Sequence, residues 1–169
     1  MGCDIHAYAE WQGSGGRWNK VGDVFPLDDL GRDWYKKECG DEPFGWRSYG
    51  LFGFLADVRN YSRVPVIAEP RGLPADMSVE VQTIWQEGWD IDGHTPSWLS
   101  RAELLAFDYE QTFEDRRVTR GNDGAALAGV GEGEQTTFRE FLGAQFFRDL
   151  EVLRQIEAPE VRIVFWFDN

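Results

Sequence analysis

The sequence predicts an α+β domain: one mostly antiparallel sheet with a strand from each end of the chain, and helices packed on one face. Three observations lead to this fold class. Apolar and polar side chains alternate at the start of the chain, an apolar run of β-forming residues lies at its end, and helical patterns with clear start signals lie between them. With 169 residues, 42% of them hydrophobic, the chain predicts a single domain over residues 1–169.

The first strand spans residues 3–10, where apolar and polar side chains alternate. Period-two alternation is typical of a half-buried strand, and it puts Asp4 and His6 on the same face. Glycines in residues 12–16 predict a turn, after which residues 18–24 return as a hairpin partner.

Two helices are indicated in the first half of the chain. Residues 47–58 place apolar side chains at helical spacing. A second helix begins after a cap at Asp76 or Ser78 and ends at Gly88. Between them, three prolines in residues 64–74 exclude a helix and predict an ordered extended loop, where binding groups are commonly found.

Two capping boxes mark helix starts in the second half. Ser100 and Glu103 have the spacing of the first box, and the preceding residues 90–97 are predicted to be the loop that enters this helix. Thr137 and Glu140 form the second box, at the start of a long amphipathic helix.

Three segments are less regular. Residues 26–46 predict a long loop with one short helix near Trp34 and Tyr35. Residues 109–120 mix charged and β-forming side chains and predict a strand, and the glycine-rich residues 121–135 predict a mobile connector.

The last strand covers residues 161–167, an apolar run typical of an interior strand. Asp168 follows it directly. If the two terminal strands are neighbours in the sheet, Asp168 approaches Asp4 and His6.

The chain carries 30 acidic against 17 basic residues, a formal net charge of −13. This charge opposes binding to nucleic acid or to an anionic membrane surface, although a few converging arginines still suit a compact phosphate ligand. Cys3 and Cys39 are too few for a disulfide framework, and no signal peptide or membrane-length apolar run is present. We therefore expect a cytoplasmic protein with reduced thiols.

The only two histidines each follow an aspartate by two positions, as Asp4 with His6 and Asp92 with His94. These four residues are the candidate catalytic set: the imidazoles would act as general base and general acid, and the carboxylates would orient them. The same four are candidate ligands for a divalent metal, which would activate water. The Asp-x-His start is similar to the opening motif of metallophosphoesterases, but their Gly-Asn-His motif is absent.

A second group of residues suits a phosphate-containing ligand. Arginines in the proline-constrained stretch can clamp phosphate oxygens, and an aromatic ring (Tyr49, Tyr61, Trp98 or Trp166) can stack on a base. The candidate substrate-binding residues are Arg59, Tyr61, Glu69, Arg71, Ser97 and Trp98.

Five segments carry a resemblance to a known family: residues 1–6 (MGCDIH), 47–62 (RSYGLFGFLADVRNYS), 69–74 (EPRGLP), 94–99 (HTPSWL) and 164–169 (VFWFDN). Through them, over nearly its whole length, the chain resembles a family of small proteins encoded by bacteriophages and prophages. The resemblance implies expression in the cytoplasm of an infected bacterium. Small non-structural phage proteins often counter host defence, which is an analogy of context.

These observations predict a counter-defence protein that binds a phosphate-containing nucleotide signal, such as a cyclic dinucleotide or an ADP-ribose derivative. Hydrolysis of a phosphodiester in that signal is the preferred hypothesis. Two alternatives stay open: a non-catalytic sponge, which would suit a homo-oligomer, and an acidic protein that inhibits a host enzyme by surface contact.

Overall fold

The computed structural model describes residues 2–27, 40–119 and 125–169, and it has the predicted α+β architecture. These residues form two compact units. The first comprises residues 1–47, 70–106 and 145–169, and the second comprises residues 48–69 and 107–144. The single-domain assignment stays a prediction. The expected short helix near Trp34 and Tyr35, and the second cysteine, Cys39, lie outside the described residues.

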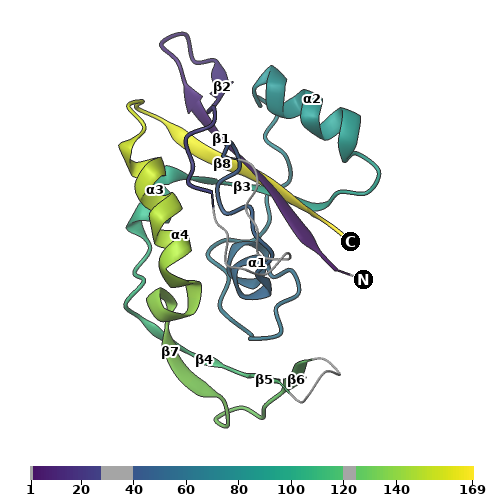
Figure 1. The fold of residues 1–169 in the computed structure, drawn as a ribbon, viewed down its shortest axis with the longest axis vertical. Helices are drawn as coiled ribbons and strands as arrows, with labels where there is room; N and C mark the ends of the chain where they lie inside the picture. The colour runs from purple at the N-terminus through teal and green to yellow at the C-terminus, as the bar shows by residue number, and fades with distance from the viewer. Residues whose placement is uncertain (1, 28–39, 120–124) are drawn as a thin grey trace. The chain divides into compact units, whose positions relative to one another are not determined.

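The first unit is built on a four-stranded antiparallel sheet in the order β2-β1-β8-β3 (Figure 1). Its strands are β1 (Asp4–Gln12), β2 (Trp18–Lys20), β8 (Val161–Asp168) and β3 (His94–Ser100). The first hairpin and the pairing of the two terminal strands are therefore confirmed. β8 lies between β1 and β3, and its residues 161–167 are all buried, so both of its faces are covered, as its continuous apolar sequence predicts.

The register between β1 and β8 decides which side chains share a face. Asp4 lies opposite Asp168, His6 opposite Trp166, and Glu10 opposite Arg162. Directly opposed residues of antiparallel strands project to the same side of the sheet. The polar residues of β1 thus line one face together with Trp166.

Helix α2 (Val79–Gly88) packs on this face. Ser78 caps it, accepting a hydrogen bond from the Val81 backbone amide, as predicted. Val81 is fully buried in one cluster with Tyr8 and Trp166, and partly buried apolar side chains surround that cluster: Leu73, Met77, Ile84, Trp85, Trp89 and Trp98.

The prediction of a loop over residues 90–97 is wrong in its second half, because His94–Ser100 forms strand β3. Pro96 disfavours a regular strand, and the register with β8 shifts between His94 and Ser97, so an irregularity accommodates the proline. The predicted capping box is confirmed: the Ser100 amide donates to Glu103 Oε2 at 2.9 Å, and the Glu103 amide donates back to the Ser100 hydroxyl at 3.1 Å. Helix α3 (Arg101–Ala106) begins there.

The second unit contains helix α1 (Tyr49–Ala56), which confirms the helix expected over residues 47–58. Two short antiparallel ribbons accompany it: β4 (Thr112–Asp115) with β7 (Glu134–Thr137), and β5 (Arg117–Thr119) with β6 (Ala125–Leu127). The connector expected over residues 121–135 therefore contains strand residues. Aromatic rings form the core of the unit: Phe54, Phe107, Tyr109, Phe113 and Phe138.

Helix α4 (Phe138–Gln155) carries the chain from the second unit into the first. Thr137 caps its start, since the Glu140 amide donates to the Thr137 hydroxyl at 3.1 Å, which is one of the two bonds of the predicted capping box. Gly143 interrupts the helix with φ 76° and ψ 170°, a conformation almost confined to glycine. Among the described residues, no helix has the length and apolar character needed to cross a membrane.

Candidate functional site

The candidate site lies where β1 begins and β8 ends. His6 Nε2 is 3.4 Å from Asp168 Oδ2, and the Asp4 backbone amide donates to Asp168 Oδ1 at 3.0 Å. The predicted approach of these three residues is confirmed, and it follows from the register of the terminal strands. We call this arrangement, with Tyr8 and Glu42 described below, the His6 centre.

Aromatic rings fix the imidazole. The Trp89 ring stacks on His6 with a centroid separation of 3.7 Å and an interplanar angle of 29°, and Trp166 lies 6.3 Å away. The His6 side chain is 17% exposed, so it is largely shielded but still reachable from solvent. Its orientation is therefore set by packing as well as by the Asp168 carboxylate.

Glu42 supplies a second titratable group. The Tyr8 hydroxyl donates to Glu42 Oε1 at 2.8 Å. Burial raises the pKa of Glu42, although the Tyr8 hydrogen bond and the charge of His6 partly offset this effect. Glu42 thus keeps its proton more readily than an exposed glutamate does, and it interacts electrostatically with His6.

Arg47 brings a permanent positive charge to the same end of the sheet. Its Nε donates to Asp4 Oδ1 at 2.7 Å, and its Nη2 pairs with Asp4 Oδ2. This bidentate ion pair balances the charge of Asp4. The carboxylate that contacts His6 is that of Asp168. The predicted orienting role of Asp4 is therefore taken by Asp168.

The His6 centre has the groups needed for acid–base chemistry. If Nε2–H of His6 donates to Asp168, the lone pair of the neutral ring lies on Nδ1, where it can accept a proton. Glu42, held toward its protonated form, can deliver one.

The structure does not bring His94 into this centre. His94 lies opposite Phe167 in the register, and Phe167 is on the face of β8 opposite to Trp166. The His94 ring stacks beside Phe167, its Nδ1 contacts the Thr95 hydroxyl at 3.0 Å, and its Nε2 is buried without a described partner. The two histidines are thus at the same end of the sheet but on opposite faces. Asp92 is exposed in the preceding turn.

The candidate binding residues are divided between the two units. In the first, Arg71 pairs with Glu103 through both terminal nitrogens and lies over the Trp98 ring at 4.7 Å. The Ser97 hydroxyl accepts from the Arg71 backbone amide at 3.1 Å, so Ser97 holds the loop in place. Three others belong to the second unit: Arg59, Tyr61 and Glu69.

The candidate metal ligands do not form a metal site. Over the described parts of the chain, no three His, Cys, Asp or Glu side chains gather in a way that could hold a metal ion. Asp4 is paired with Arg47, and His6 and His94 face opposite sides of the sheet. We therefore derive no step through a metal.

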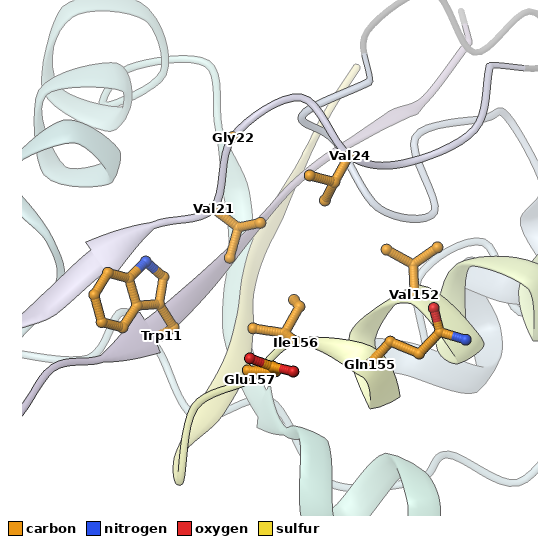
Figure 2. Close-up of a pocket in the computed structure, with 8 residues that line it drawn as sticks. All are labelled: Trp11, Val21, Gly22, Val24, Val152, Gln155, Ile156 and Glu157. Carbon is orange, nitrogen blue, oxygen red and sulfur yellow. The ribbon is translucent and has the colours of Figure 1, made fainter.

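A pocket of about 520 Å³ lies elsewhere in the first unit. Figure 2 shows its mainly apolar lining, which includes Trp11, Val24, Val152 and Ile156. It contains none of the acid–base residues described above, and nothing in the structure shows what covers it.

Sequence reasoning missed Glu42, Arg47 as a partner of Asp4, and the Trp89 ring. Glu42 lies in a segment without periodicity, so no local pattern marks it. Its role depends on contact with Tyr8 across 34 positions of sequence.

A scan of protein-family models, a search of curated proteins and a search of solved structures each found no match to this chain.

Proposed function

We propose that the protein hydrolyses a phosphodiester bond in a small nucleotide signal, with the His6 centre as its acid–base machinery. The observation that carries the proposal is the grouping of an imidazole, an orienting carboxylate and a second carboxyl group of raised pKa at one end of the sheet. Such pairs of titratable groups with different environments are characteristic of acid–base catalysts. The phage resemblance suggests a cyclic dinucleotide or an ADP-ribose derivative as the signal, and counter-defence inside an infected bacterium as the role.

The proposed reaction adds one water molecule across a phosphorus–oxygen ester bond. His6 Nδ1 takes a proton from water as the water oxygen bonds to phosphorus, and Asp168 stabilises the imidazolium that forms. The ester bond breaks, and Glu42 gives its proton to the departing oxygen. Arg47 and Asp4 form a charge-balanced pair beside the His6 centre, so the acid–base steps are assigned to His6, Asp168 and Glu42.

The test is incubation of the protein with cyclic dinucleotides and cyclic ADP-ribose isomers, with and without EDTA, followed by chromatography and mass spectrometry. We expect a product heavier than the substrate by one water. The variant His6→Gln should lose at least about 100-fold in turnover, since general acid–base catalysis contributes on the order of 10²–10⁴. Glu157→Gln, an exposed substitution away from the His6 centre, is the control and should keep wild-type turnover.

Three outcomes would contradict the proposal. Equal losses in His6→Gln and a folded His94→Gln would mean that both histidines act in one site. Recovery of unchanged nucleotide after heat denaturation would indicate a sponge. Failure to bind or cleave any member of the panel would favour the acidic inhibitor of a host enzyme.

A further inference from the structure

A second pocket lies on the same sheet face as the His6 centre, toward the opposite end of the strands. It has a volume of about 470 Å³ and belongs wholly to the first unit. Trp18, Trp98 and Arg162 line it, together with Asp76 and Glu160 at its polar side. Because Glu10 lies opposite Arg162 and His6 opposite Trp166, the pocket and the His6 centre are four residues of β1 apart, about 13 Å.

The aromatic walls of this pocket are held in place by Arg162. The guanidinium lies 3.9 Å from the Trp18 ring centroid and 6.0 Å from that of Trp98. Trp18 Nε1 donates to Asp76 Oδ2 at 3.0 Å, which fixes the indole. Two large rings are therefore presented in fixed positions, which lowers the entropic cost of stacking a flat ligand.

The positive charge of Arg162 is already balanced. Its Nε donates to the fully buried Glu10 at 2.7 Å, and its Nη1 donates to Asp76 at 2.8 Å. Glu160 is exposed at the pocket, and its carboxylate makes no hydrogen bond with the residues that the structure describes. The pocket therefore offers an unused acceptor and not an unused cation, so it suits a hydrogen-bond donor better than a phosphate.

We propose that this pocket binds a guanine base of a cyclic dinucleotide, an inference that rests on the proposed function and narrows its substrate class to dinucleotides that contain guanine. Guanine is flat and carries two adjacent N–H donors, at N1 and N2, that match the two oxygens of the Glu160 carboxylate. Adenine presents an acceptor nitrogen at the corresponding position, which a carboxylate repels. The separation from the His6 centre suits a ligand with more than one nucleoside unit.

The test uses free nucleosides, which lack phosphate and so report on the pocket alone. Titration of guanosine, followed by tryptophan fluorescence and calorimetry, should show binding at least about tenfold tighter than that of adenosine. Inosine, which keeps N1–H but lacks the N2 amino group, should fall between them. Glu160→Gln should weaken guanosine binding about tenfold, whereas Glu157→Gln, an exposed glutamate outside this pocket, should leave it unchanged.

Equal binding of guanosine and adenosine, or an unchanged affinity in Glu160→Gln, would overturn the assignment. So would the absence of guanosine binding by a protein that still cleaves a nucleotide of the panel, and that result would leave the proposed function intact. Guanosine binding without any cleavage would support the pocket and contradict the phosphodiesterase.

Discussion

At the scale of single residues, Glu42 shows how burial and charge oppose each other in the His6 centre. Burial raises its pKa above the ordinary value of 4.5, so folding favours the protonated carboxyl. The stabilising contribution of that proton is fully present below about pH 4.5 and is lost as the pH rises through the folded-state pKa. At neutral pH, the ionised fraction of Glu42 therefore opposes folding, whereas its protonated fraction is the form that can act as the general acid of the proposed reaction.

The substitution Glu42→Gln should consequently stabilise the protein at pH 7. The amide oxygen can still accept the Tyr8 hydroxyl, while the buried negative charge is removed. Urea denaturation should show a higher midpoint than wild type at pH 7 and a smaller difference at pH 4. The exposed Glu87→Gln is the matched control and should show no such pH dependence. A variant less stable than wild type at pH 7 would contradict this account.

At the scale of an element, Gly143 explains why helix α4 is not one continuous helix. Its φ of 76° and ψ of 170° lie in a region that side chains with a Cβ rarely enter, yet a Cβ there would meet no neighbouring atom within 4 Å. The constraint is therefore one of backbone conformation and not of space.

The substitution Gly143→Ala should destabilise the protein by about 1–3 kcal/mol. Gly88 also has open space around an added Cβ, but it ends α2 without a positive φ, so Gly88→Ala should be neutral or stabilising by up to about 1 kcal/mol. Chemical denaturation of both variants compares the two effects directly. Equal stability changes would show that the Gly143 conformation imposes no constraint.

At the scale of the whole molecule, β8 joins the two halves of the principal sheet, because it pairs with β1 on one side and with β3 on the other. Val164 lies in the middle of this strand and is fully buried. Val164→Pro removes a backbone donor from a central strand and should abolish the cooperative unfolding transition. Val164→Ala keeps the backbone donor and should remain cooperative with a loss of roughly 2 kcal/mol. Near-UV circular dichroism during denaturation separates these outcomes, and a cooperative Val164→Pro variant would contradict the importance given to β8.

Local patterns predicted much of this fold. Residues close together in sequence specify the terminal strands, the helix over residues 47–58, the capping box at Ser100 and the helix cap at Thr137, and the structure confirms them. Strand β3 was not predicted because Pro96 disfavours a regular strand. The strand forms through pairing with Phe165 and Phe167 of β8, which are distant in sequence.

The site was less accessible from sequence. The approach of His6 to Asp168 could be predicted because alternation marks the strand of His6 and a continuous apolar run marks the strand that Asp168 follows. Glu42 could not be predicted as part of the site, because its environment is created by side chains distant in sequence. His94 repeats the Asp-x-His spacing of His6, but one position of register places it on the other face.

The pairing of β1 with β8 also has a consequence for synthesis. Protein chains elongate at about 5–20 residues per second, so β8 leaves the ribosome roughly 8–30 s after β1. During that interval, one edge of β1 has no strand to pair with, and unpaired edges promote aggregation. The charged and polar side chains that alternate with apolar ones along β1 therefore suit a nascent strand that is exposed before β8 has been made.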